Sequence, residues 1–160
     1  MTRTDSSPAL KAFATLRFEG DSLDVSTLSE MLGVTPTLAY RKGEPYRLGK
    51  RGAEKIGETG YWLLNTKDRL GTPELSDHIA FIVDILAGAD KDQTFDRLKS
   101  AVGAASLSTL VTLFWFGQAG AQPPTIDPRL EGLVRRLRGA IETDFVTKGR
   151  DPERIDGRAA

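Results

Sequence analysis

The chain has 160 residues and a mass of 17.4 kDa, and its 22 Lys and Arg residues balance 22 Asp and Glu residues. This length suits one globular domain, because domains typically contain about 100–150 residues. A net charge of zero argues against a general nucleic-acid binder, which needs an excess of basic residues. The absence of cysteine excludes disulfides, thiolate metal sites and thiol nucleophiles.

No stretch of the sequence predicts a membrane segment or a secretory signal. Residues 1–20 lack the long apolar run of a signal peptide. The most apolar stretch, residues 107–116, is about half the length that a membrane helix needs. We therefore expect a soluble, cytoplasmic protein with a single globular domain at residues 10–146 and flexible ends at residues 1–9 and 147–160.

The first two predicted elements are a strand and a short helix. Apolar residues alternate with others over residues 12–19, which is typical of a strand that packs on one side. In residues 25–32 the apolar positions repeat at helical spacing. Asp24 can cap the start of this helix, Gly33 can adopt the left-handed conformation that ends it, and Pro36 prevents its continuation.

The next part of the chain has the least regular pattern. Residues 38–42 predict a short strand, and Gly43 predicts the turn after it. Residues 47–60 contain four glycines and predict an exposed loop. Residues 61–66 predict a strand by their composition, with Trp62 on its buried face.

A clearly marked helix begins the second half. We expect Thr72 as its N-cap and Pro73 as its first residue. Apolar residues then recur at helical spacing through Leu86, which predicts a long buried stripe. Residues 90–99 predict another short helix, and residues 107–116 predict a long strand.

The last predicted element is a helix with Asp127 as its N-cap and Pro128 as its first residue. Its apolar stripe continues at helical spacing through Leu137 to Ile141. The element order predicts an α+β fold, in which an antiparallel sheet of about four strands carries helices on one face. This is the ferredoxin-like arrangement, β-α-β-β-α-β, with an added C-terminal helix.

Few residues in the chain could perform catalysis. The one histidine, His78, rules out metal motifs that need two. His78 could act as a general base oriented by Glu74, or it could be a structural residue of its helix, and we favour the structural interpretation. The glycines around Lys50 do not form a phosphate-binding loop, because Arg51 stands where the motif needs a hydroxyl. We therefore expect no metal and no cofactor.

Basic and aromatic residues are interleaved in the segment 40–51. Such a mixture is typical of surfaces that bind single-stranded nucleic acid, but an RNA-binding signature is absent. We favour a solvated basic loop, and we expect no nucleic-acid partner. If the segment forms a binding surface, its residues are Tyr40, Arg41, Lys42, Tyr46, Arg47, Lys50 and Arg51.

The predicted strand at residues 107–116 is apolar on both faces near its end, where Phe114, Trp115 and Phe116 follow one another. Large rings on both faces predict that both faces are covered, because each ring can bury roughly 150–250 Å². The cover could be the C-terminal helix, a second subunit or a ligand. We favour cover from within the chain, with a homodimer interface as the next choice.

Several stretches together resemble the bacterial family called domain of unknown function 4279. The resemblance covers most of residues 12–145, and its motif consists of Leu32, Gly33, Pro36, Lys42, Gly43 and Trp62. It implies a small bacterial protein with an α+β fold. It brings no assigned activity, cofactor or catalytic residue, and the matching residues are ones that a fold needs for capping, turning and core packing.

These observations favour a non-catalytic protein that binds another protein, with a homodimer as one form of that binding. The alternative is a small-ligand-binding protein or an enzyme, with a pocket between the basic segment 40–51 and His78. The absence of a recognisable catalytic pattern favours a non-enzyme.

Overall fold

The computed structural model describes residues 8–88 and 91–149. Most of the predicted flexible ends, residues 1–9 and 147–160, lies outside these ranges. The elements in chain order are β1 (Ala9–Gly20), α1 (Val25–Leu32), β2 (Leu38–Tyr40), β3 (Pro45–Arg47), β4 (Glu54–Ile56), β5 (Gly60–Asn65), η1 (Thr66–Asp68), α2 (Leu75–Ala87), α3 (Lys91–Ala104), β6 (Ser108–Gly117), α4 (Pro128–Arg136) and β7 (Ala140–Thr147).

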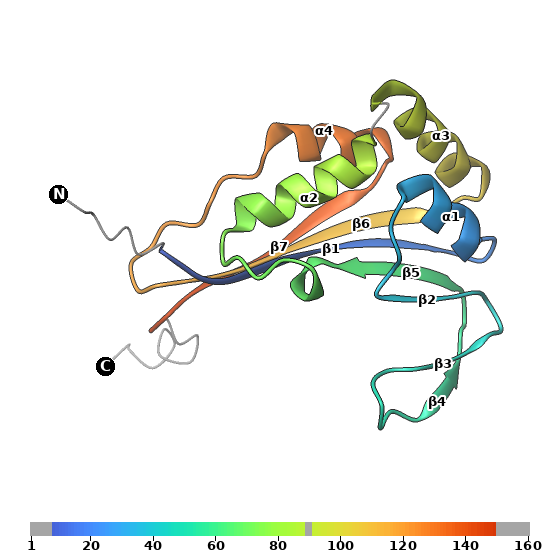
Figure 1. The fold of residues 1–160 in the computed structure, drawn as a ribbon, viewed down its shortest axis with the longest axis horizontal. Coiled ribbons are helices and arrows are strands. Elements are labelled where there is room, and N and C mark those ends of the chain that lie inside the picture. The colour runs from blue at the N-terminus through green and yellow to red at the C-terminus, as the bar shows by residue number, and fades with distance from the viewer. Residues whose placement is uncertain (1–7, 89–90, 150–160) are drawn as a thin grey trace, which may run out of the picture.

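A five-stranded sheet in the order β2-β5-β1-β6-β7 is the frame of the molecule. The four helices α1 to α4 lie on one side of this sheet, and the separate β3–β4 hairpin lies on the other side (Figure 1). The expected α+β class with helices on one face is therefore confirmed. The prediction of a purely antiparallel sheet is wrong, because β7 adds a fifth strand that runs parallel to β6.

The boundaries of α1 follow from the residues that flank it. The Asp24 carboxylate accepts a hydrogen bond from the Thr27 amide at 3.1 Å, which satisfies one free N–H of the first turn. Gly33 has a φ of 67°, and its amide donates to the carbonyls of Ser29 and Glu30. Both predicted caps are confirmed, since a residue with a side chain would be strained at this φ.

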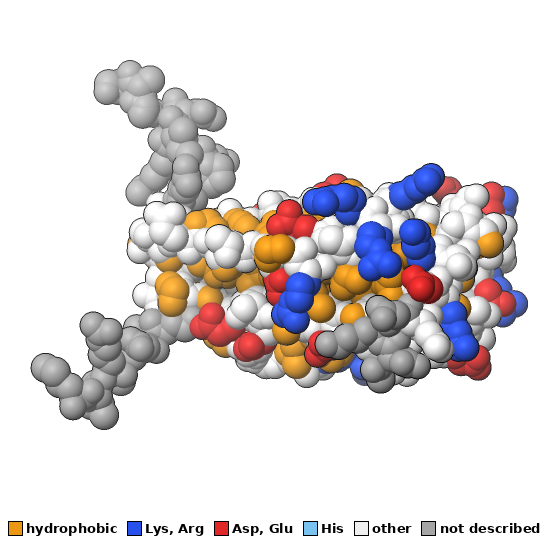
Figure 2. All heavy atoms as spheres, turned by 90° about the horizontal axis from the view of Figure 1, so that it is seen from above, with side chains coloured by type: hydrophobic (Ala, Val, Ile, Leu, Met, Phe, Trp, Pro, Cys, Tyr) orange, Lys and Arg blue, Asp and Glu red, His pale blue; other side chains and the backbone are white. Residues whose placement is uncertain are grey.

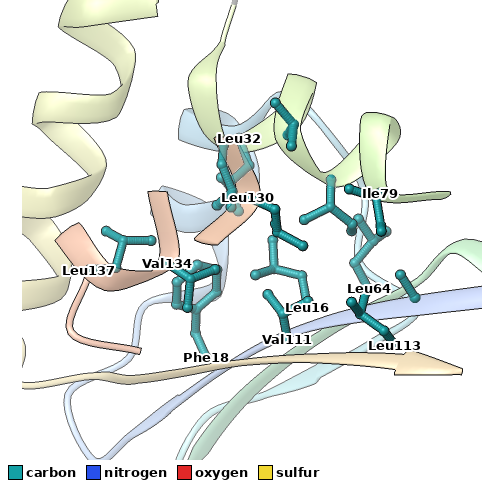
Figure 3. Close-up of a cluster of buried hydrophobic side chains, with 14 of the residues drawn as sticks. Leu16, Phe18, Leu32, Leu64, Ile79, Val111, Leu113, Leu130, Val134 and Leu137 are labelled. Carbon is teal, nitrogen blue, oxygen red and sulfur yellow. The ribbon is translucent and has the colours of Figure 1, made fainter. Parts of the chain in front are cut away.

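The core lies between the sheet and the helices (Figure 3). Leu16 and Phe18 of β1 are fully buried on the sheet side of the core, and Leu130 and Val134 of α4 enter the core from the helix side. Trp62 of β5 is also fully buried and contacts the Phe18 ring edge-on, with 5.9 Å between the ring centroids. Each such side chain contributes roughly 1.5–3 kcal/mol through the hydrophobic effect, so this layer accounts for most of the favourable free energy.

The C-terminal prediction is partly wrong. Helix α4 starts at Pro128 as expected, but it ends at Arg136, and residues 140–147 form a strand instead of continuing the helix. Ile141 fits a helical repeat because it follows Leu137 by four residues. It fits a strand equally well, because Ile141 and Phe145 also share one face of a strand, and pairing with β6 decides between the two.

The predicted loop at residues 47–60 is also corrected. Residues 54–56 pair with residues 45–47, so that Tyr46 lies opposite Lys55 and Arg47 lies opposite Glu54 in the β3–β4 hairpin. The glycines at the tip and base of this segment predicted only a turn-rich loop. Three-residue strands leave too short a pattern to be recognised in sequence.

Two smaller corrections concern the helices of the second half. Helix α2 begins at Leu75, and Thr72 and Pro73 lie before it. The Thr72 hydroxyl accepts from the Glu74 amide at 3.1 Å, in a turn that precedes the helix. Helix α3 runs to Ala104, five residues beyond the predicted end at residue 99, because its buried stripe continues to Val102.

Candidate functional site

The side of the sheet that faces away from the helices is called the open face here. Strand β1 shows the division most clearly, since Leu16 and Phe18 are fully buried while Phe13 and Arg17 are only partly covered. Alternate residues of the paired strands share this face. In the centre and on the β7 side these are Lys11, Phe13, Thr15, Arg17, Glu19, Ser108, Leu110, Thr112, Phe114, Phe116, Glu142, Asp144 and Val146.

Aromatic side chains occupy the centre of the open face. The Phe13 and Phe114 rings stack across β1 and β6, with 4.7 Å between their centroids and 17° between their planes. The Lys67 ammonium lies 6.0 Å from the centre of the Phe13 ring. Figure 1 shows the β3–β4 hairpin and η1 at the border of this side, and no described element across its centre.

The three consecutive rings of β6 therefore have different surroundings. Trp115 points toward the helices, is 2 % exposed and contacts Phe145 edge-on at 6.2 Å. Phe114 and Phe116 point to the open face and are half-buried. Among the described residues, the helices cover the Trp115 side, and no helix lies over Phe114 and Phe116, so what completes the cover of these two rings stays a prediction.

A second cluster lies at the β2 edge of the open face, where all three tyrosines of the chain form one stack. Tyr40 lies between the others, with its ring centroid 4.0 Å from that of Tyr46 and 5.3 Å from that of Tyr61. Gly57 permits this approach of the hairpin, because a Cβ at residue 57 would lie 2.6 Å from the Tyr40 ring. Beside the stack is a hollow of about 700 Å³, which Lys55 also lines.

The stack changes the acidity of its central member. Burial, the hydrogen bond with Tyr46 and the nearby charges of Tyr46, Tyr61 and Glu19 raise the pKa of Tyr40 to about 12. Each of these contacts disfavours the phenolate form. Tyr40 is therefore a neutral phenol at physiological pH and serves as a stacking and hydrogen-bonding surface, not as a base.

The structure brings together only part of the predicted basic and aromatic segment. Tyr40 and Tyr46 meet in the stack, but Arg41 lies 3.7 Å from the Asp24 carboxylate and Lys42 lies 3.1 Å from that of Asp21. The contact with Lys42 holds the pKa of Asp21 below its usual range.

The remaining basic residues of this segment also point elsewhere. Arg47 lies opposite Glu54, and Lys50 and Arg51 are exposed near the tip of the hairpin. No local pattern indicated that Tyr61 and Lys55 would join Tyr40 and Tyr46, because the pairing of β2 with β5 and of β3 with β4 brings them there.

His78 belongs to a buried chain of hydrogen bonds and not to the hollow beside the tyrosines. Its Nε2 lies 2.8 Å from the Thr72 carbonyl, which can only accept, so Nε2 carries the proton. Its Nδ1 then accepts from the Thr66 hydroxyl at 2.6 Å, and that oxygen accepts from the Ala14 amide at 2.8 Å. Both ring nitrogens thus have structural partners, as expected of a fully buried histidine.

The residues of the family motif are structural as well. Leu32 and Trp62 are buried, and the Trp62 indole donates to the Ser29 hydroxyl at 3.1 Å. Gly33 ends α1, and Pro36 lies between α1 and β2. Gly43 lies in the turn before β3, where its amide donates to the Gly57 carbonyl.

A comparison with protein families matches residues 9–146 to the domain of unknown function DUF4279. The chain belongs to this family. The resemblance that the motif carried is therefore confirmed, and the family brings no activity with it. Searches of curated proteins and of solved structures gave no match.

Within residues 8–88 and 91–149, no helix has the length and apolar character needed to cross a membrane. Over the same residues, no three His, Asp or Glu side chains come close enough to hold a metal ion.

The hydrogen-bond chain through Thr66 predicts a large stability effect. We expect Thr66→Val to lower the free energy of unfolding by about 2–4 kcal/mol, because it leaves the Ala14 amide and His78 Nδ1 buried without partners. Urea denaturation followed by circular dichroism measures the change. The same substitution at exposed Thr143 is the control and should stay within about 0.5 kcal/mol of wild type. Equal effects at both positions would contradict the proposed role of the chain.

The tyrosine stack predicts a delayed ionisation. In an alkaline spectrophotometric titration, one tyrosine of the folded protein should ionise near pH 12, and Tyr40→Phe should remove this step. Between pH 10 and 12 the folded state retains a proton that the unfolded state releases, so the free energy of unfolding falls as the pH rises through this range. Unfolded chain in denaturant is the reference, with all tyrosines ionising near pH 10. A folded protein that titrates like this reference would refute the assignment.

Proposed function

We propose that the protein is a non-catalytic protein-interaction module that binds its partner with the open face of the sheet. The observation that carries this proposal is the group of half-buried aromatic and aliphatic side chains around the stacked Phe13 and Phe114 rings. Phe116 and Leu110 lie on the same strand face. The predicted bacterial source and cytoplasmic location remain part of the proposal.

The composition of this face supports binding. An antiparallel sheet with one face in water normally carries polar residues there. Here the open face of β6 carries the partly buried Leu110, Thr112, Phe114 and Phe116, and the adjacent Val146 of β7 is 37 % exposed. These apolar side chains lie beside charged Lys11 and Arg17 of β1, and such a mixture of apolar and charged residues is typical of a binding surface.

The helix side differs from the open face. Figure 2 views the molecule from that side and shows Lys, Arg, Asp and Glu side chains spread among the hydrophobic ones. The apolar stripes of α2 and α4 point inward to the core, as shown by fully buried Ile82 and Leu130. The helix side is solvated, and its apolar side chains are already buried in the core. The open face is therefore the stronger candidate for binding a partner.

Small-ligand binding is the second candidate, and the hollow of about 700 Å³ beside the tyrosine stack favours it. Aromatic faces together with Lys55 and Glu19 offer stacking and charge in one place. His78 does not line this hollow, so it cannot serve as the general base of an enzyme that binds its substrate there. A small molecule that copurifies with the protein and is lost in Tyr46→Ala would favour this function over protein binding.

A more detailed classification of the fold is also proposed. We propose that β1, α1, β2, β5, α2 and β6 form a ferredoxin-like core, to which the β3–β4 hairpin and the α4–β7 unit are added. The spatial order β2-β5-β1-β6, in which each neighbouring pair is antiparallel, supports this description.

Site-specific photo-cross-linking tests the proposed function. A photoreactive amino acid at Thr112, in the centre of the open face, should give adducts of discrete mass in cells that express the chain. The same group at exposed Ser100 on α3 is the control and should give none. Adding Phe114→Asp to the Thr112 variant should abolish the adducts, since it places a charge in the apolar centre.

The outcome that would refute the proposed function is a Thr112 variant without adducts or with the same pattern as the Ser100 control. Adducts that survive Phe114→Asp would also count against it, because they would not depend on the apolar face. Circular dichroism checks that each variant remains folded.

A further inference from the structure

We infer that the partner on the open face is a second copy of this chain, packed face to face about a two-fold axis that runs parallel to the strands between β1 and β6. The inference rests on the proposed function and names its partner. Three observations lead to it: the register of the charged residues, the position of the hairpin and the charges on the β7 edge.

The register places opposite charges on either side of the aromatic pair. Phe13 pairs with Phe114, and Phe114 pairs with Asp144, so these residues lie at one level across β1, β6 and β7. Lys67 lies over the Phe13 ring and thus on the β5 side of the same level. One level of the open face therefore has a lysine at one end, two rings in the middle and an aspartate at the other end.

A two-fold axis at the stated position makes this level complementary to itself. It places Phe13 of one copy over Phe114 of the other, and Lys67 of one copy over Asp144 of the other. At the next level, Thr15 pairs with Asn65 and with Thr112, which pairs with Glu142, so the same axis places the Asn65 amide opposite the Glu142 carboxylate. Among the described residues, neither Glu142 nor Asp144 has an ion-pair partner within the chain.

The hairpin restricts where a second copy can lie. It projects from the β2 edge on the side of the open face (Figure 1), with Tyr46 stacked on Tyr40 of β2. A copy centred on the middle strand β1 would meet this hairpin. With the axis between β1 and β6, the overlap covers β5, β1, β6 and β7, and the hairpin of each copy lies beyond the β7 edge of the other.

Pairing of the two β7 edges is the main alternative geometry, and the charges oppose it. An antiparallel β7–β7 pair about a two-fold axis puts residues of the same strand face next to each other. In the register centred on Thr143, Glu142 would then lie opposite Asp144 of the second copy. Like charges directly opposite each other destabilise strand pairs.

The overlap area predicts the strength of the dimer. Four strands at about 4.8 Å spacing and a length of roughly 30 Å give a footprint of roughly 500–600 Å² per copy. This value lies at the small end of the range for specific interfaces. We therefore expect a dissociation constant in the micromolar range, and a mass that rises with concentration from 17.4 kDa to twice that value.

A charge-swap experiment by analytical ultracentrifugation tests the geometry. Lys67→Glu and Asp144→Lys should each raise the dissociation constant about tenfold, because each turns two attractive contacts of the dimer into repulsive ones. The double variant K67E/D144K restores opposite charges across the axis and should bind within about threefold of wild type. Lys99→Glu on α3 is the matched control and should leave the dissociation constant unchanged.

The results separate this inference from the proposed function. A wild-type protein that stays at 17.4 kDa up to millimolar concentration would overturn the second copy as partner. If the Thr112 cross-linker then yields adducts with a different protein, the proposed function stands. Single variants without effect, or a double variant as weak as the singles, would overturn the face-to-face geometry. Thermal unfolding of each variant shows whether a lost dimer reflects lost folding.

Discussion

Strand β1 lies between β5 and β6, and its side chains alternate between two environments from Lys11 to Glu19. One set, which includes Leu16 and Phe18, forms the floor of the core under the helices. The other set, which includes Phe13 and Arg17, faces away from it. A shift of one residue in the pairing of β1 would exchange the two sets and expose the core. Both the packing of the helices and the composition of the open face depend on this register.

Much of the fold was predictable because its signals are local. The caps of α1 and the alternation of β1 and β6 each involve a few neighbouring residues and gave the correct element. The errors occurred where pairing over a distance decides the structure. Residues 140–147 suit a helical stripe and a strand equally, and only the parallel partner β6 selects the strand. Strands β3 and β4 are too short to be recognised without each other.

The candidate site was predicted less well, for the same reason. The sequence placed Tyr40 and Tyr46 on a common surface, but grouped them with Arg41 and Lys42, which instead contact Asp24 and Asp21. A run of charges in sequence says little about where each side chain points. The alternation of β6 correctly placed rings on both faces of the strand. The opposing positions of lysine and aspartate around them needed the register of three strands, which no local pattern contains.

The aromatic pair on the open face can be explained partly without a partner. A cross-strand pair of rings stabilises an antiparallel sheet by roughly 0.2–1 kcal/mol, so Phe13 and Phe114 have a use within one chain. This explanation does not extend to Phe116, Leu110 and exposed Val146, which continue the apolar surface around the pair. It also gives no reason for Asp144 to stand at the level of the rings with no cation of its own among the described residues. A partner that supplies both an apolar surface and a cation accounts for all of these features, and the open face itself presents that combination.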